Sequence, residues 1–284
     1  MFEIPKPLVV ALSANGLKRS KRDYLALPLS QAELVTTALQ AREVGVPVFS
    51  CSARNPSGQA SLDTDICRSL VDALRQVSSG AMLVQLELDL QSPQSVADSA
   101  AVLSAAKPDA CLLPFSAVFP RDGDEDDENR ARDLLDLCVD LKIGVQFAMT
   151  DPADIDWYYA FRQYGVIPEM CRALLFILGD DGDRPQSDPH ALRPFLERLD
   201  KQHLLSKVVW SVAAFGLKET ASLAAAMALG GQIAPGWAYN FHTAEGEMFP
   251  SQAEQAASLK DLSDRLGRPL ASAFEARTML FGAR

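Results

Sequence analysis

The fold is decided by a short stretch, Val48-Phe49-Ser50-Cys51-Ser52-Ala53-Arg54-Asn55-Pro56. An apolar run ends there in Ser50 and Ser52, which are separated by one residue, so both side chains point to the same face of a strand. Arg54 follows at once, and Asn55-Pro56 opens a turn. Polar side chains at the carboxyl end of a strand are typical of the mouth of an α/β barrel, where such barrels carry their sites.

Short apolar runs alternate with longer amphipathic segments along the whole chain, which predicts repeated βα units and a parallel sheet. Strands are predicted over residues 8–13, 46–53, 82–88, 110–115, 144–149, 173–178, 208–214 and 232–238. Helices are predicted over residues 30–44, 63–77, 94–106, 128–141, 152–164, 189–202, 218–229 and 251–266. Ser30 and Ser251 each precede a Glu by three positions, the pattern of a capped helix start.

These segments predict the fold class α/β, as one (β/α)8 TIM barrel that forms a single domain over residues 1–284. An open doubly wound sheet would carry a Gly-rich phosphate turn after the first strand, where this chain has only Asn15-Gly16. We expect the C-terminal segment, at about residues 272–281, to pack against the barrel as an extra helix.

Composition and charge favour a small-molecule partner. The chain has 284 residues, 48% of them hydrophobic, and a net charge of −10, which repels nucleic acid and anionic membrane surfaces. The five cysteines lack metal-binding spacing and are expected to be reduced thiols. Met1-Phe2-Glu3-Ile4-Pro5 lacks the basic start of a signal peptide, and no apolar run is long enough to span a membrane. We therefore expect a cytoplasmic protein.

Several segments, in their order and spacing, carry a resemblance to a known family. They are Asn15-Gly16 and the segments 27–33, 41–45, 54–58, 177–179, 230–233, 266–270 and 275–277. Over nearly its whole length the chain resembles the beta-keto acid cleavage enzyme family. The resemblance implies a (β/α)8 barrel that holds zinc through a His-x-His pair ending the second strand and a Glu just after the eighth. It also implies acetyl-CoA as co-substrate, acetoacetate and a new acyl-CoA as products, and a homo-oligomer.

The residues at the family's metal positions do not match that pattern. The His pair falls on Ser50 and Ser52, and the Glu falls on Ala238. Neutral hydroxyls are poor zinc ligands and Ala has no donor, so we predict that zinc is absent and that no residue here is a metal ligand. Other family site positions also differ: they fall on Lys18, Glu87, Gln146, Ala148, Leu217, Ala234 and Tyr239.

A different set of polar residues is available for chemistry at the predicted mouth. Glu87 and Asp89 share one face of the third strand and are candidate general bases. Tyr239 and His242, after the eighth strand, are candidate acids, bases or hydrogen-bond partners. We take these four as candidate catalytic residues, whereas Tyr239 can also simply fill the space of a lost metal and His242 can be an ordinary loop residue.

The candidate substrate-binding residues are Arg54, Ser50, Ser52 and Asn15. Arg54 is expected to bind a carboxylate through its guanidinium fork, or to pair with Glu87 or Asp89. In the alternative interpretation that ion pair only stabilises a buried polar mouth after the metal was lost.

Three functions follow from these expectations. The chain is a barrel without zinc that is non-catalytic or binds a small carboxylate or acyl ligand. Alternatively, it is a metal-independent lyase or acyltransferase that acts on a small keto acid or acyl-CoA. In the third interpretation the family reaction persists with unconventional metal ligands.

Overall fold

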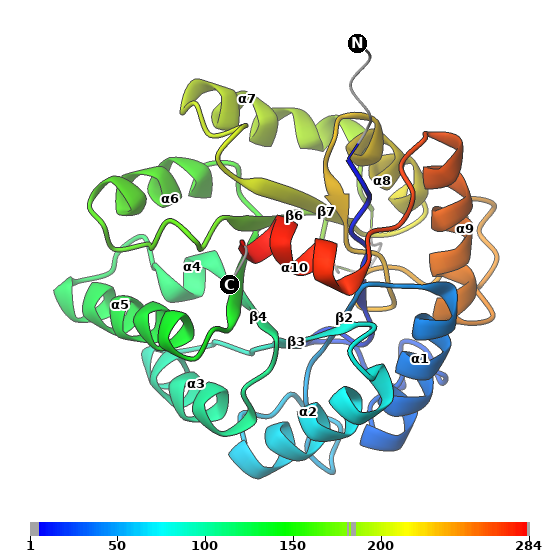
Figure 1. Cartoon of the computed structure of the whole chain (residues 1–284), viewed down its shortest axis with the longest axis horizontal. Helices are drawn as coiled ribbons and strands as arrows, with labels where there is room; N and C mark the ends of the chain where they lie inside the picture. The colour runs from blue at the N-terminus through cyan, green and yellow to red at the C-terminus, as the bar shows by residue number, and fades with distance from the viewer. Residues whose placement is uncertain (1–5, 181, 183–185, 283–284) are drawn as a thin grey trace.

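The predicted strands form one continuous parallel sheet. A computed structural model describes residues 6–180, 182 and 186–282; Met1 to Pro5, on which the signal-peptide expectation rests, lie outside this range. The sheet runs in chain order through β1 (Ala11–Ser13), β2 (Val48–Cys51), β3 (Leu83–Glu87), β4 (Ala110–Pro114), β5 (Gly144–Met149), β6 (Ala173–Leu178), β7 (Val209–Ala214) and β8 (Gln232–Ile233). A parallel bridge between Val10 and Ile233 joins its two edges. The predicted (β/α)8 barrel is therefore confirmed (Figure 1).

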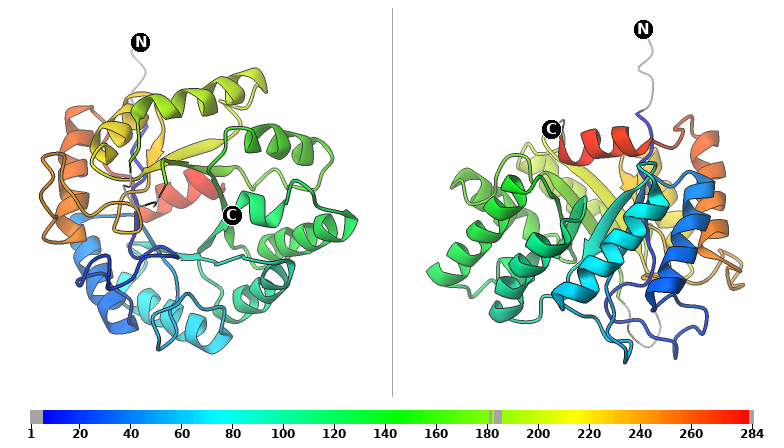
Figure 2. Two further views of the ribbon diagram at one scale, coloured as in Figure 1. Left: turned by 180° about the vertical axis from the view of Figure 1, so that it is seen from behind. Right: turned by 60° about the horizontal axis from the view of Figure 1, so that its bottom comes forward.

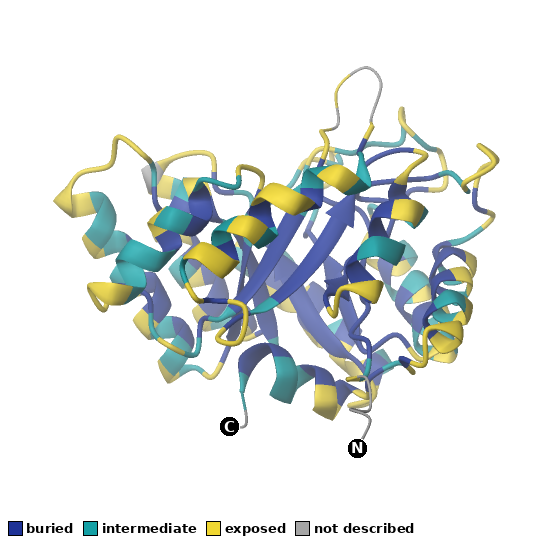
Figure 3. Ribbon diagram, turned by 90° about the horizontal axis from the view of Figure 1, so that it is seen from above, coloured by how far each residue is buried: buried dark blue, intermediate teal, exposed yellow. Residues whose placement is uncertain are grey.

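Helices surround this barrel and bury their apolar sides against it (Figure 3). They are α1 (Gln31–Val44), α2 (Thr64–Ser78), α3 (Pro93–Ala106), α4 (Phe115–Val118), α5 (Glu125–Asp140), α6 (Asp154–Gln163), η1 (Pro189–Leu192), α7 (Arg193–Lys201), α8 (Glu219–Ala228), α9 (Gln252–Arg265) and α10 (Ala273–Phe281). Ser30 and Glu33 form the complete capping box that the sequence predicted for α1. Among the described helices none is long and apolar enough to cross a membrane.

The eighth strand is much shorter than predicted. It ends at Ile233 instead of continuing to position 238, because Pro235 has no N–H to donate and Gly236 turns the chain with φ +136°. The chain then crosses directly over the end of β1, where the Ala238 N–H donates to the Ser13 carbonyl. A Cβ at position 236 would lie 2.2 Å from that carbonyl oxygen, so only glycine fits this crossing.

Polar side chains from three strands join in the barrel interior. Gln85 on β3 donates to Gln146 on β5 at 3.0 Å, and Gln146 donates to the Ser211 hydroxyl on β7 at 3.3 Å. Because all three side chains are buried, this chain of hydrogen bonds satisfies polar groups that would otherwise destabilise the core.

Helix α10 closes the amino-terminal end of the barrel, opposite the mouth (Figure 2). Its Phe281 packs directly on Gly144 at the start of β5, where a Cβ would lie 2.4 Å from the ring. Gly144 therefore has no side chain because the aromatic ring occupies that space. This end of the barrel is therefore closed by packed apolar side chains.

We predict that Phe281→Ala destabilises the protein by about 3–5 kcal/mol, the usual cost of truncating a buried aromatic side chain. Phe274→Ala is the matched control, because Phe274 lies on the same helix and is 78% exposed. Urea unfolding of both variants measures the difference. Equal stabilities for the two variants would show that α10 does not seal the barrel.

Candidate functional site

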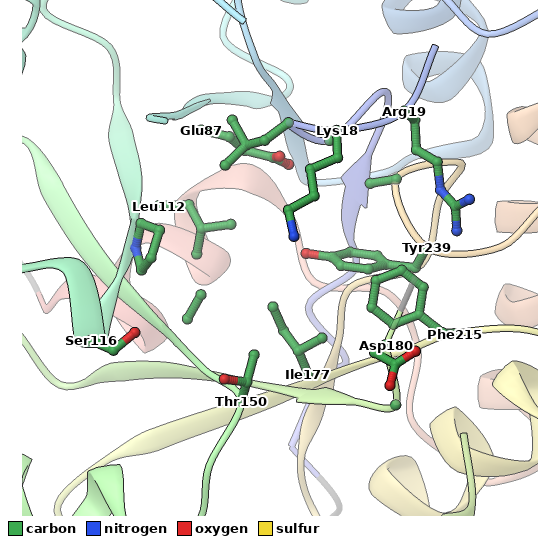
Figure 4. Close-up of a pocket in the computed structure, with 16 residues that line it drawn as sticks. Lys18, Arg19, Glu87, Leu112, Ser116, Thr150, Ile177, Asp180, Phe215 and Tyr239 are labelled. Atoms are coloured by element: carbon green, nitrogen blue, oxygen red, sulfur yellow. The ribbon is translucent and has the colours of Figure 1, made fainter. Parts of the chain in front are cut away.

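A cavity of about 400 Å³ opens at the carboxyl ends of the strands. Its wall is built by residues at the ends of the strands and just after them. They are Gly16 to Arg19 after β1, Glu87 on β3, Leu112 and Pro114 on β4, Ser116 on α4, Ala148 and Thr150 around the end of β5, Ile177, Gly179 and Asp180 around the end of β6, Phe215 after β7, and Ala238 and Tyr239 after β8. Figure 4 shows these side chains around the open space. This cavity therefore lies at the barrel mouth, where the sequence analysis expects a site.

Glu87 lies at the floor of this cavity. It is the last residue of β3, pairs in register with Leu112 and is only 5% exposed. The Ser50 hydroxyl donates to its carboxylate at 2.9 Å. Burial raises the pKa of Glu87, and interactions with Ser50, Ser13 and the charge of Arg54 only partly oppose that rise. A buried carboxyl with a raised pKa in a cavity is the kind of group that serves as a general acid or base.

Tyr239 lines the same cavity as Glu87. It is 6% exposed, and burial together with the negative charge of Glu87 raises the pKa of its phenol, while an interaction with Ser13 lowers it. The phenol thus keeps its proton and can donate a hydrogen bond. The exposed Lys18 side chain reaches in from the loop after β1, and its amine and the Tyr239 hydroxyl point toward each other (Figure 4).

Three of the predicted substrate-binding residues hold the loop after β1 in place. Asn15 exchanges two hydrogen bonds with the backbone of Ser52, at 3.1 and 2.9 Å, and the Ser52 hydroxyl donates to the Gly16 carbonyl at 2.8 Å. Arg54 donates to the carbonyls of Asn15, Gly16 and Gly58. These contacts fix the loop that carries Lys18 into the cavity.

The expectation that Arg54 forms an ion pair with Glu87 or Asp89 is wrong. Within the described residues the guanidinium forms no such pair, because the three carbonyls take its hydrogen bonds, and the carboxylates attract it only at longer range. Asp89 does not line the cavity and accepts a hydrogen bond from Gln91.

His242 lines a second, smaller cavity of about 270 Å³ next to the first. The two cavities share Arg19 and Tyr239 in their walls. Of the four predicted catalytic residues, the structure therefore brings together Glu87 and Tyr239, while Asp89 and His242 lie outside the main cavity.

A buried carboxyl that the sequence did not suggest supports the loop after β8. Glu219, at the start of α8, is 1% exposed and accepts hydrogen bonds from Asn240 at 2.9 Å and Gln255 at 2.8 Å. Burial raises its pKa to about 8, despite those hydrogen bonds. Asn240 in turn donates to the His242 carbonyl, so Glu219 holds the segment that presents Tyr239.

Other residues of the cavity also went unrecognised in the sequence. Ser116, Thr150 and Asp180 lie just beyond strands, and Arg19 lies in the loop after β1. A systematic reading of the first polar residue after every strand would have found Ser116, Thr150 and Asp180. Arg19 is one of four basic residues between positions 18 and 22, with Lys18, Lys21 and Arg22, so charge alone did not single it out.

The residues at the three positions where the resemblance implies zinc ligands do not fit a zinc ion. The Ser50 hydroxyl binds Glu87, the Ser52 hydroxyl binds a carbonyl, and Ala238 offers no donor. Across the described part of the chain, no three His, Cys, Asp or Glu side chains gather as a metal-binding group. The donor chemistry of these three positions is thus unlike that of a zinc site.

Comparison with known proteins identifies the family. The sequence profile of the beta-keto acid cleavage enzyme matches residues 7–281. The chain belongs to the beta-keto acid cleavage enzyme family. It is 20% identical over 281 residues to a 3-keto-5-aminohexanoate cleavage enzyme of Fusobacterium nucleatum subsp. nucleatum, covering 96% of this chain and 97% of that protein.

A second relative is a 3-oxoadipate:acetyl-CoA acetyltransferase of Cupriavidus necator, 23% identical over 279 residues, with 97% of this chain and 95% of that protein covered. Among solved structures, a type I 3-dehydroquinate dehydratase from Clostridium difficile is similar with a TM-score of 0.60 and 7% identity, over 93% of this chain and 94% of that one. A truncated 3-deoxy-D-arabino-heptulosonate 7-phosphate synthase from Thermotoga maritima is similar with a TM-score of 0.55 and 14% identity, over 93% and 89%. At such identities the solved structures support the barrel fold alone.

We predict that Glu219→Gln makes stability less dependent on pH. The folded protein keeps a proton on Glu219 up to about pH 8, whereas the unfolded chain loses it near the ordinary value of 4.5. Between those values the folded state binds more protons, so the wild type loses stability as pH rises, by at most about 1.4 kcal/mol per pH unit. Gln can still accept from Asn240 and Gln255 and carries no proton to lose.

Urea unfolding at pH 6, 7 and 8 measures this effect. The free energy of unfolding of Glu219→Gln should gain on that of the wild type at each step. Glu245→Gln, at an exposed position in the loop after β8, is the control and should follow the wild type. Parallel curves for Glu219→Gln and the wild type would contradict the prediction.

Proposed function

We propose that this family member binds a small keto acid, or a related acyl carboxylate, at the barrel mouth without a zinc ion. The observation that carries the proposal is the open cavity itself, which Glu87 lines and in which the amine of Lys18 and the phenol of Tyr239 point toward each other (Figure 4). A concave site with an apolar wall and a few convergent polar groups is the usual form of a small-molecule site.

The polar groups suit a carboxylate ligand. Lys18 supplies positive charge, and the hydroxyls of Tyr239, Ser116 and Thr150 can donate hydrogen bonds to ligand oxygens. The raised pKa of Glu87 lets this carboxyl keep its proton to a higher pH than an ordinary glutamate does, and a protonated carboxyl repels an incoming anion less than an ionised carboxylate would. The names of both relatives refer to keto acids, which supports this ligand class.

The zinc-free part of the proposal rests on the donors at three positions. Ser50, Ser52 and Ala238 provide two neutral hydroxyls, both already engaged, and a methyl group. Replacing two imidazoles and a carboxylate with these groups removes the ligands that zinc prefers.

The cytoplasmic location, the homo-oligomer and the absence of nucleic-acid partners stay predictions.

We predict that purified protein contains far less than one equivalent of zinc and binds small carboxylates such as levulinate after treatment with a chelator. Lys18→Met should weaken that binding about tenfold, or about 1.4 kcal/mol, because it removes the positive charge at the mouth. Isothermal titration calorimetry measures the affinity, and elemental analysis measures the metal. Lys207→Met is the matched control, since Lys207 is exposed at the other end of the barrel, just before β7.

Two results would contradict parts of this proposal. Stoichiometric zinc, with acetoacetate release that a chelator abolishes, would support the family reaction with unconventional ligands instead. Equal affinities for Lys18→Met and Lys207→Met would place the ligand outside the main cavity.

A second candidate function is metal-independent proton transfer, as in a lyase acting on a small keto acid. It is favoured by the position of Glu87, a buried carboxyl with a raised pKa whose cavity also holds the phenol of Tyr239. Ionised Glu87 would take a proton from the carbon beside the ligand carbonyl, and the resulting enolate oxygen would be stabilised by hydrogen bonds from Tyr239. Return of a proton to that carbon restores both the ligand and Glu87.

We predict that this activity, if Glu87 carries it, appears as protein-dependent exchange of the hydrogens next to the levulinate carbonyl in deuterated water, followed by NMR. Glu87→Gln should lower the rate by about a hundredfold or more, the usual contribution of general base catalysis. Because the base must be ionised, the rate should rise with pH through the raised pKa of Glu87. Ser50→Ala removes a hydrogen bond that lowers this pKa, so its profile should move to higher pH.

Glu245→Gln is the control for this experiment, because Glu245 is exposed in the loop after β8. If levulinate binds but Glu87→Gln exchanges its hydrogens as fast as the wild type does, Glu87 is not the base and the binding function alone remains.

A further inference from the structure

Arg19 is a mostly buried cation whose hydrogen-bonding capacity is not used by the residues that the structure describes. Its side chain is only 11% exposed. Within the described residues its guanidinium donates no hydrogen bond, and the buried Nε has no partner. A guanidinium has five N–H donors, and buried donors are nearly always satisfied. Donors left open in this way beside a cavity point to a ligand.

Two aromatic rings hold the guanidinium in a fixed place. Its central carbon lies 5.7 Å from the centre of the Phe215 ring and 5.2 Å from that of Phe241. Such contacts stabilise a cation and leave its edge, where the N–H groups are, free to meet an acceptor. The carboxylate of Asp23 lies 3.9 Å from the guanidinium, so it balances the charge without accepting a hydrogen bond.

The location of Arg19 suggests what it binds. It belongs to the walls of both cavities, the main one with Glu87 and the smaller one lined by Gly216, Leu217 and His242. The smaller cavity is framed by the loops after β7 and β8, which in many barrels of this kind bind an anion such as phosphate. Guanidinium groups bind carboxylates and phosphates through two parallel hydrogen bonds.

We propose that Arg19 anchors a second anionic group of the ligand. The preferred ligand is then a dianion, with one end in the main cavity beside Lys18 and Tyr239 and the other end on Arg19, at the wall that the two cavities share. This inference rests on the proposed carboxylate-binding function and adds to it the class of ligand, a chain with an anion at each end.

The test compares three ligands of the same length by calorimetry. Hexanoate carries one carboxylate, adipate adds a second at the far end, and 5-phosphonopentanoate has a phosphonate in that place. We expect the wild type to bind at least one of the two dianions about tenfold more tightly than hexanoate, as one charge-assisted contact would give. The dianion that binds more tightly distinguishes a carboxylate end from a phosphate-like end.

Variants at position 19 assign that preference to the guanidinium. Arg19→Gln should weaken the better dianion about tenfold and leave hexanoate within about twofold. Arg22→Gln is the matched control, because it removes the same charge from the exposed Arg22 in the same loop. Arg19→Lys keeps the charge on the aromatic rings but not the planar fork, so it should lose part of the preference even where Arg19→Gln is too unstable to measure.

The outcomes separate this inference from the function on which it rests. Equal affinity of the wild type for hexanoate and both dianions, or equal losses for Arg19→Gln and Arg22→Gln, would overturn the role of Arg19 while leaving carboxylate binding intact. Failure of all three ligands to bind would overturn both.

Discussion

The buried carboxyl of Glu87 is the constraint on which the rest of the site depends. A carboxyl in the barrel interior must be protonated or supported by hydrogen bonds and charge. Here Ser50 donates to it, Ser13 interacts with it, and Arg54 attracts it from a distance. The strands β1, β2 and β3 therefore meet through polar side chains at their ends, and the loop after β1 is fixed above them.

The barrel could be predicted almost completely from the sequence, because its signals are local. Six of the eight predicted strands begin or end at the observed residue at one boundary or both, and Ser30 caps α1 as expected. The short β8 is the exception, since its end depends on how the chain crosses β1 at Gly236, a contact between distant segments. Periodicity does not carry information of that kind.

The site was predictable only in part, for the same reason. That Glu87 and Tyr239 face the mouth follows from strand alternation and the position after β8. The role of Arg54 does not follow from the sequence, because its guanidinium can bind either a ligand or the carbonyls of a loop. The conformation of the loop after β1 decides between these partners, and here the carbonyls of that loop accept the hydrogen bonds. Arg19 looked like one basic residue among several, and its burial between Phe215 and Phe241 depends on residues about two hundred positions away.

The two roles proposed for Glu87 require opposite protonation states. Protonated Glu87 leaves Lys18 and Arg19 to attract an anion, whereas ionised Glu87 repels it but can remove a proton from carbon. A ligand that carries negative charge raises the pKa of Glu87 further when it binds, and by linkage it binds more weakly where Glu87 is ionised. Affinity should therefore be highest below the pKa of Glu87 and proton transfer fastest above it. Opposite pH trends for binding and exchange are the signature of one carboxyl group that does both, and a binding protein without catalysis would show only the first.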